Sequence, residues 1–272
     1  MVKTSAATVF MPMRIIACGQ RRERLCWCGV RCVGCGGRGV KSGEDRIDMS
    51  DARAAELAAE LCAAHDFSTG QRWIAIAGPP GSGKTTLVSA LVAALQARGV
   101  ASVGIPMDGY HFTRAELDRM PDPAAAHRFR GSPFTFDGER FVRDVREARR
   151  VGAFAFPGFD HSAGDPVADA HPLQASSRVV LVEGNYLLLD ESPWRDLPAL
   201  FDETWYLQCS LPTAKRRLAA RHMAAWSWTL EQAMERIEDN DARNMALIAA
   251  SPGVQRATRV IDVDDPPRSE TP

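Results

Sequence analysis

The most constraining feature of this sequence is a glycine-rich segment, Gly78-Pro79-Pro80-Gly81-Ser82-Gly83-Lys84-Thr85, which fits the pattern G-x4-G-K-[ST] in full. It lies between a short apolar run, residues 73–77, and an expected helix at about residues 84–98. This placement predicts a loop between a strand and a helix, the context in which the pattern binds phosphates. The alternative is an ordinary turn with a chance lysine, which residue frequencies allow in roughly 1% of chains this size.

The residue types of this loop suit a nucleoside triphosphate. Glycines let backbone N–H groups approach phosphate oxygens, and the following helix adds the positive end of its dipole. Lys84 is expected to reach the β- and γ-phosphates, and the Thr85 hydroxyl to coordinate magnesium. We therefore predict that ATP is bound, together with Mg²⁺ at Thr85, by nine consecutive residues: Gly78, Pro79, Pro80, Gly81, Ser82, Gly83, Lys84, Thr85 and Thr86.

The rest of the main region alternates strand and helix signals, which predicts an α/β fold with a mostly parallel sheet covered on both faces. The expected strands are residues 73–77, 102–107, 179–182, 203–209 and 258–263. The expected helices are residues 52–64, 84–98, 137–150, 212–223 and 230–250.

Two carboxylates follow expected strands. Asp108 comes after residues 102–107 and Glu183 after residues 179–182. In open α/β sheets, ligands bind beyond the carboxyl ends of the strands. Asp108 could therefore accept the proton of an attacking hydroxyl, and Glu183 could hold a magnesium-bound water. The alternatives are an Asx-type turn formed by Asp108 with Gly109 and a plain strand-terminal turn at Glu183.

Several motifs in order resemble the uridine kinase, pantothenate kinase and phosphoribulokinase superfamily. After the phosphate loop they are Asp108-Gly109-Tyr110-His111, Arg130-Gly131-Ser132-Pro133-Phe134-Thr135-Phe136-Asp137, Phe156-Pro157-Gly158-Phe159-Asp160-His161, Glu183-Gly184 and residues 215–221. The resemblance spans residues 71–264, and it is strongest to bacterial nucleoside- or sugar-kinase-like members, including fructose-associated kinases.

This resemblance implies a P-loop three-layer fold with a five-stranded parallel sheet and a helical lid. It implies an ATP-dependent kinase that phosphorylates a hydroxyl of a nucleoside, a sugar or a pantothenate-like compound. It also implies Asp108 as the catalytic base and Glu183 near the magnesium. The residues expected to contact the substrate are Tyr110, His111, Arg130, Asp160 and His161.

Some of these residues also have simpler interpretations. Arg128 and Arg130 could contact an anionic or polyhydroxyl substrate, or could be surface charges before a turn. A lone histidine such as His111 or His161 is more often a structural hydrogen-bonding group than a ligand.

The basic segment 215–221 contains a candidate pair of catalytic arginines. Arg217 and Arg221 are four residues apart, so on a helix both guanidinium groups can point to the same side. We predict that they stabilise the charge of the transferring phosphoryl group. A solvated helical face is the alternative.

An ATPase or a nucleotide-dependent regulatory module is the competing functional class, because the phosphate loop is common to both and to kinases. A GTPase is improbable because the sequence has no Asn-Lys-x-Asp motif. We favour the kinase because Asp108, Asp160 and His161 are of the types that bind hydroxyl groups.

Charge and cysteine content limit the partners. Lys plus Arg number 33 and Asp plus Glu 34, so the overall charge does not favour nucleic acid or an anionic membrane. Five of seven cysteines precede Met49, which argues against a disulfide framework in the main region and for a reducing, cytoplasmic location. A small-molecule hydroxyl compound is the expected partner, and a homodimer remains open.

Residues 1–48 differ in kind from the rest, being rich in Arg, Cys and Gly without helical or strand periodicity. Three interpretations compete: a zinc site at Cys26, Cys28, Cys32 and Cys35, a targeting peptide, or an extension upstream of a true start at Met49. We favour the extension. The expected domain organisation is therefore a non-native or disordered segment at 1–48, a kinase domain at 49–266 and a disordered tail at 267–272.

Deleting residues 1–48 is expected to leave both the stability and the activity of the protein intact, because no periodic core-forming face lies there. Thermal unfolding and turnover of the truncated and full-length chains check this. Loss of folding, or about one zinc per chain in the full-length protein, would contradict it.

Overall fold

The computed structural model of the protein describes residues 49–264. The predicted N-terminal extension, its cysteines and the C-terminal tail lie outside the described residues, so those expectations remain predictions.

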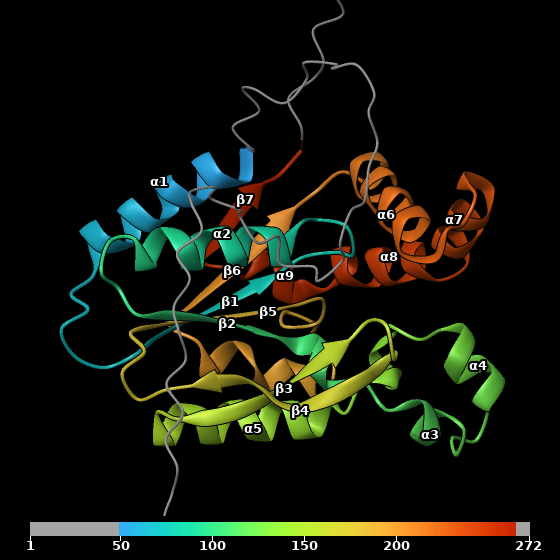
Figure 1. Cartoon of the computed structure of the whole chain (residues 1–272), viewed down its shortest axis with the longest axis horizontal. Coiled ribbons are helices and arrows are strands. Elements are labelled where there is room, and N and C mark those ends of the chain that lie inside the picture. The colour runs from blue at the N-terminus through green and yellow to red at the C-terminus, as the bar shows by residue number, and fades with distance from the viewer. Residues whose placement is uncertain (1–48, 265–272) are drawn as a thin grey trace, which may run out of the picture. The chain divides into compact units, whose positions relative to one another are not determined.

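A central sheet of five parallel strands organises the described part, in the order β2-β5-β1-β6-β7 (Figure 1). The prediction of a five-stranded parallel sheet is therefore confirmed. The strands are β1 (Arg72–Ala77), β2 (Ser102–Pro106), β5 (Val179–Gly184), β6 (Glu203–Gln208) and β7 (Arg259–Asp262). Each observed boundary lies close to the one expected from the apolar runs.

Both faces of the sheet are covered, as a buried parallel sheet requires. Alternate residues of β1 point to opposite sides: Ile74 and Ile76 join one buried cluster, whereas Trp73 and Ala75 join another. Figure 1 shows helices α1 (Met49–Ala64) and α2 (Lys84–Gln96) on the first side and α5 (Gly138–Val151) on the second.

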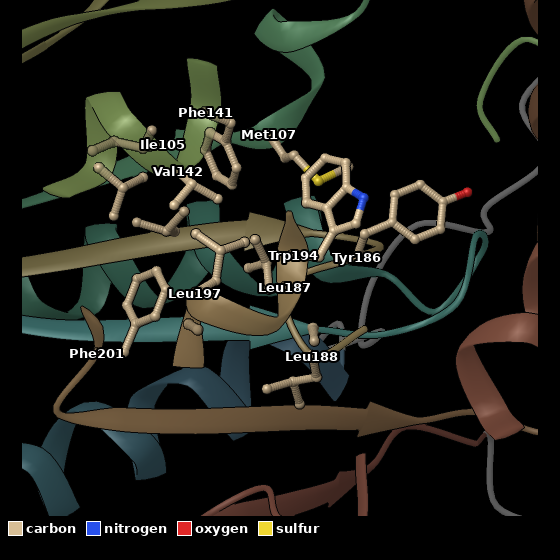
Figure 2. Close-up of a cluster of buried hydrophobic side chains, with 14 of the residues drawn as sticks. Ile105, Met107, Phe141, Val142, Tyr186, Leu187, Leu188, Trp194, Leu197 and Phe201 are labelled. Atoms are coloured by element: carbon tan, nitrogen blue, oxygen red, sulfur yellow. The ribbon is translucent and has the colours of Figure 1, made fainter. Parts of the chain in front are cut away.

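The second cluster anchors the segment that follows β2. Met107, the residue before Asp108, is fully buried there with Phe141, Trp194 and Tyr186 (Figure 2). Because aromatic and thioether side chains of this size bury a large apolar area, they fix the backbone from which Asp108 projects.

A third buried cluster joins the helices after β6. Helices α6 (Leu211–Trp226), α7 (Leu230–Arg236) and α8 (Ala242–Ala250) contribute Leu218, Ala233 and Met245, and Ile237 lies between α7 and α8. We expected one helix over residues 230–250, but a π-helical turn, Ile237–Asp241, separates α7 from α8. Such turns are frequent at functional sites.

A two-stranded antiparallel hairpin, β3 (Phe154–Asp160) and β4 (Asp165–Leu173), was not expected. Prolines normally argue against a strand, and Pro157, Pro166 and Pro172 interrupt its pattern. A free hairpin tolerates them because it lies outside the central sheet, and its register shifts between Phe156 and Gly158. The remaining short helices are α3 (Arg114–Leu117), α4 (Pro123–Arg128) and α9 (Pro252–Gln255).

Within residues 49–264, every helix falls short of the length and apolar character that crossing a membrane would require.

Candidate active site

Strand register brings the predicted site residues to one edge of the sheet. β5 lies between β1 and β2, with Ala77 paired to Gly184 and Pro106 paired to Glu183. All three strands are parallel, so their carboxyl ends meet at the same edge. The phosphate loop, Asp108 and Glu183 therefore converge there, as expected from the position of ligands in open α/β sheets.

The phosphate loop requires glycine at two of its positions. Gly81 and Gly83 have φ angles of 80° and 87°, in the left-handed region that strains other residues. A side chain at Gly81 would also collide with the backbone of α6, because a Cβ there would lie 2.5 Å from the Ala214 carbonyl oxygen.

Helix α2 begins at Lys84 without a side-chain cap. Backbone N–H groups in the first turn of a helix have no intrahelical acceptor, and a capping side chain normally satisfies one or more of them. Here they remain available at the positive end of the helix dipole. This is the arrangement that binds phosphate.

Lys84 is buried within the loop, with 8% of the residue exposed. Its Nζ donates hydrogen bonds to the carbonyl oxygens of Gly78 at 2.9 Å and Pro79 at 3.0 Å. Burial lowers the pKa of Lys84 to about 8, against the opposing effect of the Glu183 and Asp108 carboxylates. A phosphate anion would favour the charged ammonium.

Thr85 and Glu183 lie together at the edge of the loop. The Thr85 hydroxyl donates a 2.8 Å hydrogen bond to Oε1 of Glu183, of which only 7% is exposed. Burial raises the pKa of Glu183 to about 7, and the negative charge of Asp108 acts in the same direction. A buried carboxylate and a hydroxyl oxygen side by side fit the hard oxygen ligands that Mg²⁺ prefers.

Asp108 lies on the short turn Met107–Tyr110 directly after β2 and is half-buried. Its carboxylate accepts no hydrogen bond from any residue in 49–264, which argues against the Asx-turn interpretation. Its charge is close enough to influence the pKa of Lys84, Glu183 and His111. The carboxylate is therefore open to a ligand beside the phosphate loop.

Gly109 lets the β3–β4 hairpin approach Asp108. A Cβ at this position would lie 2.1 Å from the Pro157 carbonyl oxygen, which no side chain could tolerate. The glycine thus brings the 157–161 segment, expected from the family resemblance to contact substrate, next to the Asp108 turn.

His111 stands between the two segments. Its ring stacks on Phe136 with a centroid distance of 3.8 Å and lies 4.9 Å from the Phe159 ring. Burial lowers the pKa of His111 to about 4, so the imidazole is neutral near pH 7. Its Nδ1 is buried and has no hydrogen-bond partner among the described residues.

The two arginines before Gly131 have different surroundings. Arg128 makes a two-pronged hydrogen bond to the Asp239 carboxylate at 2.8 and 2.6 Å, at the surface. Arg130 turns inward, donating to the Phe112 carbonyl oxygen at 2.8 Å, with its guanidinium 5.3 Å from the centre of the Phe159 ring. Only Arg130 lies beside the ring that His111 contacts.

Three predicted substrate residues have other positions. Tyr110 is buried and donates a 3.0 Å hydrogen bond to Asp144 of α5, which leaves no surface for a substrate. Asp160 closes the hairpin turn, because its Oδ1 accepts from the amides of Ser162 and Ala163. His161 is exposed at that turn, with its ring centre 5.2 Å from that of Phe159.

Arg217 and Arg221 both lie on α6. Arg217 donates a 2.9 Å hydrogen bond to the Val263 carbonyl oxygen, after β7. Arg221 is exposed, and its charge influences the pKa of both Lys84 and Glu183. Arg221 is therefore within electrostatic reach of the phosphate loop.

Sequence reasoning missed Arg114, whose guanidinium lies near Arg130 at the hairpin turn. It stands six residues after Asp108, outside every motif. Only a search for basic residues close to the Asp108 motif could have suggested it.

The comparisons with known proteins agree with this architecture. Residues 73–263 match the model of the phosphoribulokinase / uridine kinase family. A Schizosaccharomyces pombe protein described as a uridine kinase is 39% identical over 180 residues, which cover 64% of this chain and 77% of that protein.

Two solved structures are similar to the fold. A Silicibacter protein described as a fructose transport system kinase has a TM-score of 0.68 at 32% identity, covering 76% of this chain and 98% of its own. D-glycerate 3-kinase from Cryptococcus neoformans has a TM-score of 0.54 at 15% identity, covering 81% of this chain and 97% of its own. At that identity the second likeness shows the fold alone.

Proposed function

Because the chain belongs to the phosphoribulokinase / uridine kinase family, and is thus an ATP-dependent kinase, we propose that it transfers the γ-phosphoryl group of ATP to a hydroxyl of a small molecule. The observation that carries this proposal is the convergence of the phosphate loop, Asp108 and Glu183 at one edge of the sheet. Phosphoryl transfer depends mainly on positioning and charge stabilisation, which such an edge can supply.

The phosphate loop and the uncapped start of α2 would hold the triphosphate. Backbone N–H groups from Gly81 to Thr86 would surround the phosphate oxygens, and Lys84 would leave its two carbonyl partners to bind the β- and γ-phosphates. Thr85 and Glu183 would hold magnesium. When bound there, the ion would neutralise charge on the β- and γ-phosphate oxygens.

Asp108 would orient the acceptor and take its proton. Its carboxylate makes no hydrogen bond to residues 49–264 and lies within electrostatic reach of Lys84, so a hydroxyl bonded to it would be near the γ-phosphate. As the oxygen attacks phosphorus, its proton would pass to the Asp108 carboxylate. The neutral His111 imidazole, with its unpartnered Nδ1, would bind a further polar group of the acceptor.

Arg221 would stabilise charge on the transferring group. It is exposed on α6, the helix that contacts the phosphate loop at Gly81. A cation in this place can approach the phosphates, because Arg221 makes no ion pair with residues 49–264 that would first have to break.

The cysteines bear on the location of the protein. The two described cysteines, Cys62 and Cys209, are free thiols, which fits a reducing, cytoplasmic location.

The function is tested by an ADP-release screen over nucleosides, sugars and pantothenate, with a reaction lacking any acceptor as the control. We expect ADP release to depend on one acceptor class and a phosphorylated product to form in equal amount. ADP release at the same rate with and without every acceptor would instead identify an ATPase, and would overturn the kinase proposal.

A further inference from the structure

Two guanidinium groups meet at the turn of the β3–β4 hairpin. A Cβ on Gly164 would lie 3.7 Å from Nη1 of Arg130 and 3.8 Å from both Cζ and Nε of Arg114. Both arginines therefore lie against the same glycine, although they come from separate segments of the chain. Burial lowers the pKa of Arg130, and the positive charge of Arg114 acts in the same direction against the opposing effect of Asp165.

The negative charge nearby is too small to balance the pair. Asp165 lies 3.6 Å from Nη2 of Arg130, and its Oδ1 also accepts the backbone amide of Arg114 at 2.8 Å. Asp160, the other carboxylate of the hairpin turn, is engaged by the turn amides. The two cations thus have one nearby carboxylate between them, which pairs with Arg130 alone and is 38% exposed.

Donor groups of the pair also lack acceptors. The Arg114 guanidinium makes no hydrogen bond or ion pair with any residue of the described part of the chain. Nε of Arg130 is buried without a hydrogen-bond partner there, although only 17% of this side chain is exposed. A buried donor left unpaired destabilises the folded state, so an anion that accepts from this Nε–H would stabilise it.

The arginine pair is connected to the proposed acceptor site through aromatic rings. The Arg130 guanidinium lies over the Phe159 ring, and His111 contacts the same ring. His111 in turn lies within electrostatic reach of Asp108 and of Arg130. The order Asp108, His111, Phe159, Arg130 therefore runs from the proposed site of proton transfer to the arginine pair.

We propose that the acceptor is an anion whose carboxylate or phosphate group is bound by Arg130 and Arg114 while its hydroxyl is bound by Asp108. This inference rests on the proposed kinase function and names the substrate class of the same site. Planar guanidinium groups match the oxygen geometry of both anions, and charge-assisted hydrogen bonds of this kind are the strong ones. A neutral nucleoside or sugar would leave the two cations with only the half-exposed Asp165 carboxylate as counter-charge.

Anion binding can be tested without turnover. With the phosphate loop saturated by ADP and Mg²⁺, thermal unfolding is followed while inorganic phosphate is added. We expect a concentration-dependent rise in the melting temperature of the wild type, and its loss in Arg114→Gln and Arg130→Gln. The control is Arg119→Gln, another exposed arginine just after α3, which should respond as the wild type does.

Folding of the variants is controlled within the same experiment. Arg114 is exposed, so its replacement should not disturb the core. Arg130→Lys keeps the positive charge of this half-buried residue. It replaces Arg130→Gln in the experiment if that variant fails to fold. No rise in the wild type, or an equal rise in Arg114→Gln, would overturn the proposal.

Turnover then distinguishes carboxylate from phosphate acceptors. The acceptors are tested as pairs that differ in the anionic group: D-glycerate and glycerol, pantothenate and pantothenol, ribose 5-phosphate and ribose. We expect only anionic members to be phosphorylated. In Arg114→Gln the KM for that acceptor should rise roughly ten- to a hundred-fold, with the KM for ATP unchanged.

The two proposals fail in different ways. Equal use of a neutral member of any pair would overturn the anionic acceptor while leaving the kinase proposal intact. Arginine-dependent phosphate binding together with acceptor-independent ADP release would support the anion site and overturn the proposed kinase function.

Discussion

Replacing Lys84 with alanine is expected to reduce turnover at least about a thousand-fold, to the limit of detection. Lys84 is the only cation among the loop residues Gly78 to Thr85. It is already positioned inside the loop by two carbonyl oxygens, and removing one preorganised charge-stabilising group typically costs about 10²–10³ in rate. Loss of phosphate binding adds to this effect. Acceptor-dependent product formation and ATP affinity measured on the same preparation check the prediction.

The fold of the Lys84→Ala variant should survive, because the substitution removes a buried charge whose pKa is lowered by that burial. Thermal unfolding establishes this. Arg146→Ala, which removes an exposed cation of α5, is the control and should keep full activity. An active Lys84→Ala enzyme with unchanged ATP affinity would show that the triphosphate is not bound at this loop.

Replacing Asp108 with asparagine is expected to lower acceptor-dependent phosphorylation by about 10²–10⁴-fold, the usual contribution of a general base. Asparagine keeps the shape of the side chain but cannot take the proton of the acceptor hydroxyl. Nucleotide binding should survive, so ATP affinity should change less than roughly tenfold, or about 1.4 kcal/mol. Both quantities are measured on one preparation of the variant.

The matched control is Asp196→Asn, which makes the same chemical change at an exposed position. It should behave as the wild type does. Near-wild-type phosphorylation by Asp108→Asn would remove Asp108 from the mechanism. Retention of ADP release that does not depend on any acceptor would favour an ATPase whose water is oriented by another group.

A consequence of the site geometry is that Asp108 and the arginine pair divide the work on the acceptor. Asp108 acts at the hydroxyl and should affect mainly kcat, whereas Arg114 is remote from the reacting atoms and should affect mainly KM for the acceptor. The kinetic parameters of these two variants therefore separate reaction from recognition.

The phosphate loop and the strands around it could be located along the chain from the amino-acid sequence. The reason is that both depend on local properties. Gly81 and Gly83 adopt left-handed backbone conformations, which favour glycine. Strands β1 and β5 are buried on both faces of the sheet, and such strands appear in the sequence as continuous apolar runs. The break in residues 230–250 and the β3–β4 hairpin escaped prediction, because a π-helical turn and prolines in a strand are stable only in their tertiary context.

Which polar side chains share a site depends on contacts between distant parts of the chain. Spacing along the chain could place Tyr110, Asp160 and Arg217 near the ligand, but the orientation of a side chain is set by the partners that packing brings to it. Asp144 holds Tyr110 in the core, and the carbonyl of Val263 holds Arg217 at the end of β7. The same dependence on long-range packing explains why Arg114, which lies outside every motif, meets Arg130 at the hairpin turn.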